Sequence, residues 1–473
     1  MYALDSRLIH ECSPKLLREE YSIYKKIKTD AFNHKKVQIP MGADGVTWKS
    51  FEKDLDHQVV SMSKRMSSGS YFFYPFREVL VPKDSHKHRI ISIASIRDVL
   101  VQRRVQTVLR DELEKLFNQL PSVSYAYRPQ FSASQAVMKV YQYIKEGYDY
   151  VLDADIKNFF DEIPHFLLLA QFEKLFQKES PLLYTLLKRY ISTDRVEWKT
   201  YEGNLKLFYK QKPKRTYRRK GIPQGGALSG LIANLYLHPF DEWVVNDLGQ
   251  NMDIKYIRYA DDFIILTRDR FNLETIKNQT REKLSEIGLQ LHPNQQKTKL
   301  VHVAEQSIDF LGFNLSQTGI RISKHNIRKF KQRIRNILTE LDSDEVQDND
   351  AKKVICKIQY KLLGNETNGM RICQTCKKIE TRRSWLQFFL CLTDVQQLKG
   401  LDLWIRKTIH LFYFKQTGKR LKRHRLIEMN IQRLEQLYYA YRKEIGKRTV
   451  CTCSPLVADF RRESILNVLF KRY

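Results

Sequence analysis

Acidic residues that could bind metal ions stand at the ends of two strand-like segments. Asp261 and Asp262 lie in Tyr259-Ala-Asp-Asp262, between apolar runs, and Asp155 ends the segment 149–155. Neighbouring carboxylates repel each other unless cations neutralise them, and Mg²⁺ prefers oxygen ligands of this kind. Carboxylates from separate strands can hold two metal ions about 4 Å apart, which catalyses in-line phosphoryl transfer. These residues therefore predict a phosphoryl-transfer site.

Each of these motifs also has a simpler structural explanation. Asp is a common turn former, so Asp261 and Asp262 could merely close a hairpin, and Asp161 could cap a helix. The glycine-rich stretch 221–226 precedes a predicted helix that begins at Ser229, and glycines there allow close approach of a backbone or a nucleotide. Such a loop is weak evidence by itself, so the prediction depends on the combination.

Strands and helices alternate through the first two thirds of the sequence and must position these motifs. Alternating apolar residues predict strands at 76–82, 89–93, 149–155, 256–259, 263–267 and 308–322. Helical spacing predicts helices over 95–118, most of 165–192 and 271–291. This alternation is typical of an α+β or α/β layer architecture.

The sequence changes character after residue 322. Helical patterns, the first of them strongly cationic, cover 324–341, 351–363, 384–393, 398–417 and 425–445. The acidic stretch 342–350 is expected to be an exposed connector. The C-terminal third is therefore expected to be a basic, all-helical module.

The composition points to a polyanionic partner. The chain has 473 residues, with 82 Lys and Arg against 53 Asp and Glu, which gives a formal net charge of +29. Nucleic acid is the commonest partner of so basic a chain. Apolar residues make up 42%, which excludes a wholly disordered chain. The sequence has no uncharged apolar run of about 18 residues and no secretion signal, so no membrane association is expected.

The seven cysteines are few and scattered, which fits a reduced cytosol better than a disulfide scaffold. Cys373 and Cys376 form one CxxC pair, but Cys451 and Cys453 do not supply a second pair of suitable spacing. Free thiols are therefore expected rather than a zinc site.

Taken in order, the motifs resemble those of reverse transcriptases, and specifically of the bacterial group II intron branch. The similar palm motifs are Asp155-Ile-Lys-Asn-Phe-Phe-Asp161, Pro223-Gln-Gly225 with Ser229 and Asn234, Tyr259-Ala-Asp-Asp262, Gly288-Leu-Gln-Leu291 with Lys297-Thr-Lys299, and Phe310-Leu-Gly-Phe313. Upstream, the similar segments are 42–47, 81–83, 89–93 and 124–129. Two features depart from that branch: Gly230 stands where it usually has proline, and a convincing endonuclease domain is lacking.

The resemblance implies a right-hand polymerase of the α+β class, with fingers, a palm built on an antiparallel sheet, and an all-helical thumb. The implied domains are an N-terminal helical extension at 1–75, fingers and palm at 76–320, the thumb at 321–445 and a tail at 446–473. Asp155 and Asp261 would bind two Mg²⁺ ions, for which Mn²⁺ can substitute, beside Asp262 and the carbonyl of Ile156. The metals would activate a primer 3′-hydroxyl and stabilise the pyrophosphate leaving group.

The resemblance also implies contacts to the incoming nucleotide. Lys83 and Arg89 are expected to bind its triphosphate, although both could be solvated strand-end cations. Phe160 stands where this family has its steric gate, which excludes a ribose 2′-hydroxyl, but core packing explains the ring nearly as well. Gln224 would lie against the nucleotide. Lys297 would help to protonate pyrophosphate, with the lysine two residues later as a near-equal alternative.

A cationic segment directly precedes Gln224 and is expected to bind nucleic acid. Its seven cations within eleven residues are Lys210, Lys212, Lys214, Arg215, Arg218, Arg219 and Lys220. Contacts of this kind to phosphates give affinity without reading sequence. A second cluster at 419–425 is followed by three tyrosines that could stack on bases, although core packing is the better explanation for Tyr438 and Tyr441.

The expected function is RNA-directed DNA synthesis from dNTPs by two-metal nucleotidyl transfer. The resemblance favours a stand-alone enzyme of antiviral (phage) defence in the bacterial cytoplasm, which copies a structured non-coding RNA; a homo-oligomer is compatible with this. The alternative is a group II intron-encoded maturase and reverse transcriptase that acts in splicing and retrohoming. A mutagenic retroelement polymerase ranks last, because that family usually alters the stretch in which Gln224, Gly225 and Ser229 are present here.

Overall fold

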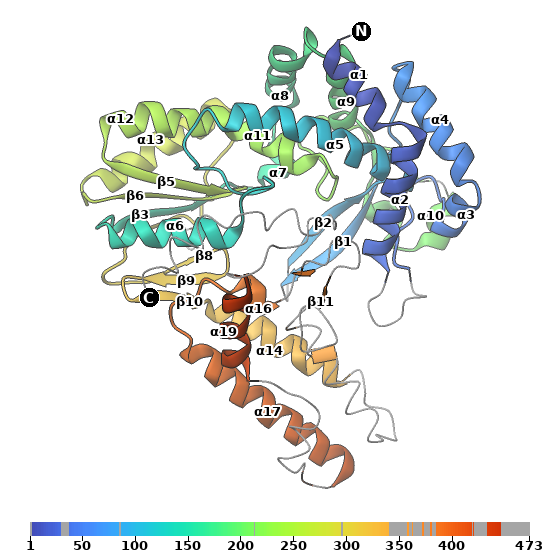
Figure 1. The fold of residues 1–473 in the computed structure, drawn as a ribbon. Helices are drawn as coiled ribbons and strands as arrows, with labels where there is room; N and C mark the ends of the chain where they lie inside the picture. The colour runs from blue at the N-terminus through green and yellow to red at the C-terminus, as the bar shows by residue number, and fades with distance from the viewer. Residues whose placement is uncertain are drawn as a thin grey trace. The chain divides into compact units, whose positions relative to one another are not determined.

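In the computed structural model, whose ribbon is drawn in Figure 1, the chain forms two compact units. The first unit comprises residues 1–128, 154–263 and 274–299, and the second comprises 129–153, 264–273 and 300–473. The residues that the structure describes are 2–29, 37–84, 87–211, 213–294, 297–339, 385–418 and 433–445, with short pieces at 357–358, 362, 371–372, 379–380 and 420. Each unit is described by itself.

Four helices open the first unit: α1 (Ala3–Glu11), α2 (Pro14–Lys28), α3 (Trp48–Lys53) and α4 (Leu55–Ser67). Pro14 stands at the first position of α2, where its missing N–H costs no hydrogen bond. α1 and α2 both pack against α5 (Ile96–Phe117), whose first turn is capped by the Ser95 hydroxyl.

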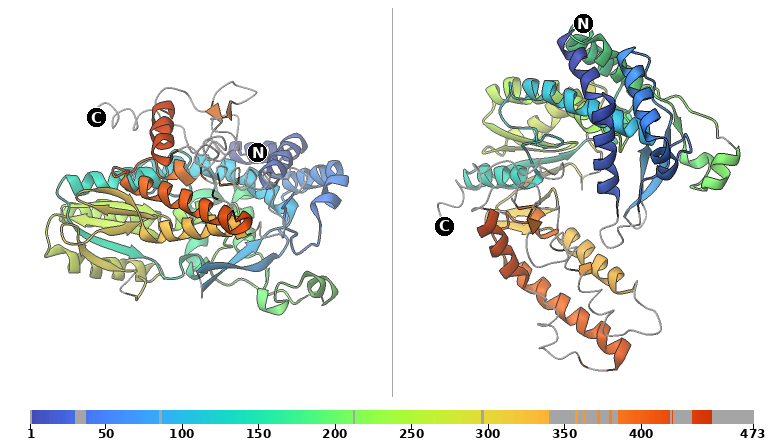
Figure 2. Two further views of the ribbon diagram at one scale, coloured as in Figure 1. Left: turned by 90° about the horizontal axis from the view of Figure 1, so that it is seen from below. Right: turned by 45° about the vertical axis from the view of Figure 1, so that its right-hand side comes forward.

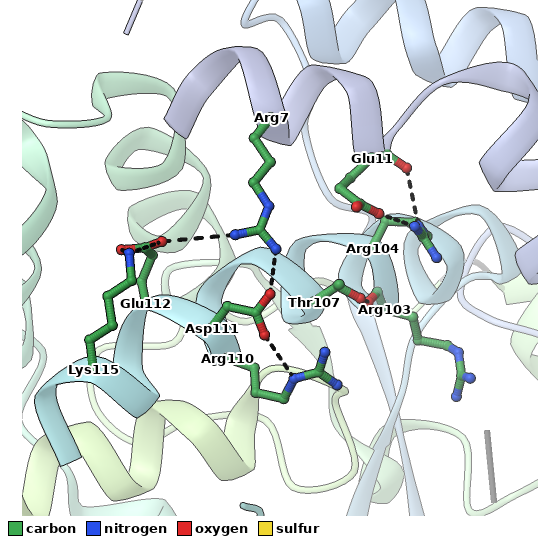
Figure 3. Close-up of polar contacts among 9 residues, drawn as sticks. All are labelled: Arg7, Glu11, Arg103, Arg104, Thr107, Arg110, Asp111, Glu112 and Lys115. Carbon is green, nitrogen blue, oxygen red and sulfur yellow. Dashed lines mark hydrogen bonds and ion pairs between the residues drawn. The ribbon is translucent and has the colours of Figure 1, made fainter. Parts of the chain in front are cut away.

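Ion pairs join α1 to α5 along their shared length (Figure 3). Arg7 pairs with Asp111, and Glu11 accepts hydrogen bonds from Arg104 through both its carboxylate and its backbone carbonyl. Apolar residues between these pairs, Leu8 and Val108 among them, are fully buried. The N-terminal helices are therefore an integral part of this unit.

The first sheet of this unit has the order β2-β1-β4. β1 (Phe76–Asp84) and β2 (Lys87–Ile93) form an antiparallel hairpin, and β4 (Arg195–Val196) runs parallel to β1. The hairpin is visible below α5 in Figure 1. α7 (Phe159–Glu162), α8 (His165–Phe172), α9 (Pro181–Ile191) and α10 (Leu205–Gln211) complete the connection to the glycine-rich stretch.

A four-stranded sheet of order β5-β6-β3-β7 carries the acidic motifs, and the strand ends that bear them, at 154–155 and 261–263, belong to the first unit. Its strands are β5 (Ile254–Tyr259), β6 (Asp262–Thr267), β3 (Tyr150–Asp155) and β7 (Lys299–His302). The inner strand β6 carries a continuous apolar run, Phe263 to Leu266, and these residues are fully buried. α11 (Ser229–Trp243) packs on β5 and β6 through Phe240, whose ring contacts those of Tyr256 and Phe263. A short helix, α12 (Gly249–Asn251), leads into β5.

The second unit combines a small meander with helices. β8 (Ile308–Phe310), β9 (Phe313–Ser316) and β10 (Gly319–Ile322) form an antiparallel sheet, and α6 (Ala133–Lys145) packs near β9. α14 (Lys324–Thr339) lies beside α17 (Gln396–Thr417), as Figure 2 also shows, and α17 contacts α19 (Leu434–Ile445). Phe330 stacks on Trp385 of α16 (Trp385–Phe388) with ring centroids 4.2 Å apart, which fixes α14 to that helix.

Most predicted elements are present, with four differences. The helix predicted at 384–393 is present only as the short α16, which ends at Phe388. The helix predicted at 271–291 ends earlier, as α13 (Asn272–Glu286), because Gly288 adopts a left-handed conformation and Leu289 N–H bonds the Leu284 carbonyl. The predicted helical run 165–192 is interrupted before Pro181. Two paired strands, β11 (Arg371–Ile372) and β12 (Ile379–Glu380), lie in the module expected to be all-helical, in a stretch that has no helical periodicity.

Some predictions fall outside the described residues. They are the connector 342–350, most of the helix at 351–363, the start of the helix at 425–445, most of the 419–425 cluster, the tail 446–473, and the cysteines at 373, 376, 451 and 453. Cys12 and Cys391 are described and are free thiols. In the part of the chain that the structure describes, no helix is long and apolar enough to cross a membrane.

Candidate active site

The acidic motifs meet at the ends of neighbouring strands in the first unit. Asp155 is the last residue of β3, Asp261 lies in the tight turn between β5 and β6, and Asp262 is the first residue of β6. β3 and β6 are adjacent in the sheet, and the backbone N–H of Ile156 donates to the Asp261 carbonyl at 3.4 Å. Residues more than 100 positions apart in the sequence are thus brought together, as the motifs predicted.

The turn that carries Asp261 is held from behind by a buried ion pair. The guanidinium of Arg258 donates to both carboxylate oxygens of Asp241, at 2.7 and 2.5 Å, and to the Ala260 carbonyl at 3.1 Å. Ala260 has a left-handed backbone (φ 61°), a conformation that needs such support outside glycine. Burial alone would lower the pKa of Arg258, but the Asp241 carboxylate outweighs it and raises that pKa. The pair therefore fixes the backbone next to the catalytic candidates.

This ion pair was missed from the sequence. The sequence feature that could have indicated the pair is an arginine in the middle of an otherwise apolar strand, Tyr256-Ile-Arg-Tyr259. Arg258 and Asp241 have side chains only 1% and 2% exposed. Tyr256 donates its hydroxyl to Asp241 at 2.7 Å, and Asn234 accepts from Arg258 at 3.0 Å, so the buried charges are fully hydrogen-bonded.

Lys297 forms an ion pair with Asp155. Two backbone hydrogen bonds hold the segment before Lys297 beside the end of β3. The His292 N–H donates to the Asp155 carbonyl at 2.8 Å, and the Lys157 N–H donates to the Gln290 carbonyl at 2.9 Å. Lys299, the alternative left open by the sequence, instead begins strand β7. Of the two lysines, Lys297 is therefore the one that contacts the Asp155 carboxylate.

The glycine-rich stretch lies against the residues that follow Asp155. The Ile222 N–H donates to the Phe160 carbonyl at 2.7 Å, and any side chain at Gly221 (φ 77°) would come within 2.8 Å of that carbonyl. The Phe160 ring is half-buried and packs edge-on to Phe159, which is compatible with a gate and with core packing alike. Gln224 donates to Asp161 at 3.2 Å.

Asp161 is not the helix cap that the sequence allowed. It lies inside α7, whose N-cap residue is Asn158, and it accepts the Gln224 hydrogen bond. Burial raises the pKa of Asp161, although the nearby Arg218 guanidinium acts in the opposite direction. Asp161 therefore helps to position the glycine-rich stretch next to α7.

Strand β2 passes beside Gln224, whose carbonyl accepts from the Ser92 N–H at 2.7 Å. A side chain at Gly225 would meet the Ile91 side chain at 2.9 Å, so this face of β2 looks toward the stretch. Arg89 is exposed and shares that face, because alternate residues of a strand point the same way. The side chain of Lys83 lies outside the described residues.

The cationic segment divides into exposed and buried residues. The exposed cations are Lys210, Lys214, Arg215, Arg219 and Lys220, and Lys212 lies outside the described residues. Lys220 pairs with Glu162 at 2.5 Å. Arg218 differs from the expectation: it is only 4% exposed, and burial lowers its pKa despite the nearby Glu78 and Asp161 carboxylates. It is thus an internal structural cation rather than a phosphate contact.

The donor set at the strand ends is suited to Mg²⁺. Asp155, Asp261 and Asp262 are all partly exposed and offer carboxylate oxygens, which are the ligands that Mg²⁺ prefers. Over the residues that the structure describes, no group of three or more His, Cys, Asp or Glu side chains is close enough to count as a metal site. The chemistry of the donors fits the ion, and the side-chain arrangement does not by itself define its position.

Comparison with known proteins is consistent with this geometry. The family model "Reverse transcriptase (RNA-dependent DNA polymerase)" matches residues 81–315. The chain is 27% identical over 319 residues to protein YkfC of Escherichia coli K12, across 60% of this chain and 78% of YkfC. It is 24% identical over 322 residues to the group II intron-encoded protein LtrA of Lactococcus lactis, across 55% of this chain and only 50% of LtrA.

A third relative belongs to another kind of element. The chain is 26% identical over 251 residues to the retron Ec73 reverse transcriptase of Escherichia coli, across 52% of this chain and 72% of that protein. The matched region contains Asp155, the glycine-rich stretch and the Asp261 turn. Residues 81–315 therefore form the reverse transcriptase domain of an RNA-directed DNA polymerase, with homologues among group II intron-encoded and retron proteins.

Proposed function

We propose that this chain copies an RNA template into DNA by two-metal nucleotidyl transfer at the Asp155–Asp261 site. The observation that carries the proposal is the meeting of the β3 and β6 ends, where Ile156 N–H bonds the Asp261 carbonyl at 3.4 Å. Carboxylates from two adjacent strands are what a pair of metal ions requires. The buried Arg258–Asp241 pair holds the turn in place, so the carboxylates need little reorganisation on binding.

The residues of the site have two kinds of role in this proposal, metal binding and proton donation. Two Mg²⁺ ions, or Mn²⁺ in their place, would be held by Asp155, Asp261, Asp262 and the Ile156 carbonyl. When bound, the metals make the primer 3′-hydroxyl a better nucleophile and stabilise the pyrophosphate that leaves. The Lys297 ammonium, paired with Asp155, would donate a proton to the departing pyrophosphate oxygen.

Removal of divalent ions tests the metal part of the proposal. Full chelation of Mg²⁺ and Mn²⁺ should abolish DNA synthesis on a primed RNA template, and added Mg²⁺ should restore it. Lys297→Ala should lower kcat with Mg²⁺ present, whereas Lys299→Ala is the matched control and should change it little. Synthesis that persists in full chelation would refute the two-metal assignment.

Phe160 is proposed to select deoxyribonucleotides. Its half-buried ring directly follows the catalytic segment and is anchored by the Phe160–Ile222 backbone bond. Phe160→Ala should raise rNTP use relative to dNTP use by roughly tenfold, because a bulky ring can exclude the 2′-hydroxyl. If Phe160→Ala remained active and discriminated between dNTP and rNTP as the wild type does, Phe160 would have only a packing role in the core.

For the biological role, we propose antiviral defence in the bacterial cytoplasm, with a structured non-coding RNA as the template. The net charge of +29 and the exposed cations of the 210–220 segment support an RNA partner. Splicing and retrohoming of a group II intron is the alternative, which the similarity to LtrA supports. Sequencing the RNA and DNA that co-purify with the protein separates the two, because intron RNA would favour the alternative.

A further inference from the structure

Tyr127 is an exposed aromatic residue on an otherwise buried turn. In residues 123–128, all of which the structure describes, every other side chain is buried, whereas Tyr127 is 50% exposed. Its backbone is left-handed (φ 58°), an uncommon conformation for a residue with a bulky side chain. Strained, exposed residues on a rigid turn are a recurrent feature of functional sites.

The backbone on both sides of Tyr127 is firmly tied to the first unit. Before it, the Arg258 N–H donates to the Val123 carbonyl at 2.8 Å, and the Tyr125 N–H donates to the Arg258 carbonyl at 2.9 Å. Asn234 donates its side-chain amide to the Ala126 carbonyl at 2.6 Å. After it, Arg128 donates to Glu114 at 2.8 Å. The same Arg258 and Asn234 that support the Asp261 turn therefore also fix the turn of Tyr127.

The Tyr127 ring lies on bare backbone at Gly230. A Cβ atom added at Gly230 would come within 2.4 Å of Tyr127 Cδ1 and 2.5 Å of Cγ, closer than real Cβ atoms approach. Gly230 is the second residue of α11, where glycine is costly compared with alanine. The space that glycine leaves is filled by the Tyr127 ring.

The Tyr127 ring lies against the start of α11, directly after the glycine-rich stretch, and its turn is hydrogen-bonded to β5, the strand that leads into the Asp261 turn. Burial raises the pKa of the Tyr127 phenol to about 12; the charge of Asp261 acts in the same direction and that of Arg89 in the opposite direction. Asp261 is a proposed metal ligand, and Arg89 is the proposed triphosphate contact. A nucleotide that spans these two groups would pass the exposed part of the Tyr127 ring.

We propose that Tyr127, seated on Gly230, contacts the incoming nucleotide and sets its affinity. The inference rests on the proposed polymerase reaction and adds a residue to it. An aromatic ring offers a stacking surface of roughly 1–3 kcal/mol per base, which every base can use. Gly230 acts through Tyr127, as a positioning residue.

A double-mutant cycle in the full chain tests the proposal. Tyr127→Ala should raise KM for dNTP roughly tenfold, with the Kd for primer–template unchanged, whereas Tyr127→Phe keeps the ring and should remain within about threefold of wild type. Gly230→Ala should reproduce the rise in KM, because the added methyl displaces the ring. In the Tyr127→Ala background, Gly230→Ala should not raise KM any further. It should raise Tm, because alanine is the better helix former.

The outcomes separate this inference from the reaction on which it rests. The Tyr127 contact would be overturned if Tyr127→Ala left KM for dNTP unchanged. It would also be overturned if Gly230→Ala raised KM by the same factor with and without Tyr127→Ala. If the wild-type chain made no DNA on any primed RNA, the polymerase proposal itself would fail. A binding measurement tests the Tyr127 contact independently of catalysis. Fluorescence would give the Kd of a dNTP for the complex of protein, RNA template and dideoxy-terminated primer. A Kd that is the same for Tyr127→Ala and wild type would refute the contact.

Discussion

Two hairpins carry the proposed catalytic and nucleotide-binding residues, and they are built in opposite ways. The β5–β6 turn is supported by the Arg258–Asp241 pair, whose side chains are 1% and 2% exposed. The β1–β2 hairpin carries Arg89 on a surface where even the apolar Val81 and Ile90 are exposed. Carboxylates that must hold metal ions gain from a rigid interior, whereas a cation that binds a mobile triphosphate can remain on an adaptable surface.

This contrast predicts where a substitution damages the fold and where it damages only substrate binding. A buried ion pair cannot lose one partner without leaving an uncompensated charge in the interior. A surface cation, by contrast, is solvated whether or not its ligand is bound. The two hairpins should therefore respond to arginine replacement in different measurements.

The largest expected effect is on the buried pair. Arg258→Met should lower the free energy of unfolding by about 3–5 kcal/mol, because Asp241 would stay buried without its partner. Urea unfolding followed by circular dichroism measures this. The matched control is Arg18→Met, which breaks an Arg–Asp pair that is 51% and 82% exposed and should cost less than about 1 kcal/mol. Equal losses in the two variants would contradict the contrast.

A smaller effect, of a different kind, is expected at the exposed hairpin. Arg89→Ala should raise KM for dNTP about tenfold and leave the unfolding curve unchanged, since the charge-assisted bond to phosphate exists only in the complex. Steady-state kinetics with a primed RNA template gives the value. Arg89→Lys should recover part of the affinity, because it keeps the charge without the bidentate fork. A large drop in stability with unchanged KM would show that Arg89 is structural.

The smallest effect per residue is expected in the cationic segment. Replacing Lys210, Lys214, Arg215 and Arg219 together by alanine should weaken RNA binding and reduce the slope of log K against log salt by about 0.7 for each phosphate that the segment no longer neutralises. Arg218→Gln is the informative comparison, because this buried side chain should change stability and leave the salt slope intact. A slope that is unchanged in the fourfold variant would remove the segment from the RNA-binding surface.

Local patterns in the sequence were enough to predict most strands and helices. The motif spacing also predicted that Asp155 and Asp261 would meet, because both stand at strand ends. The Arg258–Asp241 pair was not predictable in the same way, since it joins α11 to β5 and depends on their packing. A run of cations gives no indication that Arg218 turns inward. Nor could the sequence distinguish Lys297 from Lys299, because only the path from Gln290 to His292 beside β3 decides between them.

The most direct test of the proposed reaction is the double substitution Asp261→Asn plus Asp262→Asn, assayed for DNA synthesis on a primed RNA template. Synthesis should fall at least about a thousandfold, as loss of metal stabilisation is worth several kcal/mol in the transition state. RNA binding and Tm should stay close to wild type, because both side chains lie at a partly exposed turn. Undiminished DNA synthesis by the folded double variant would contradict the assignment of this site.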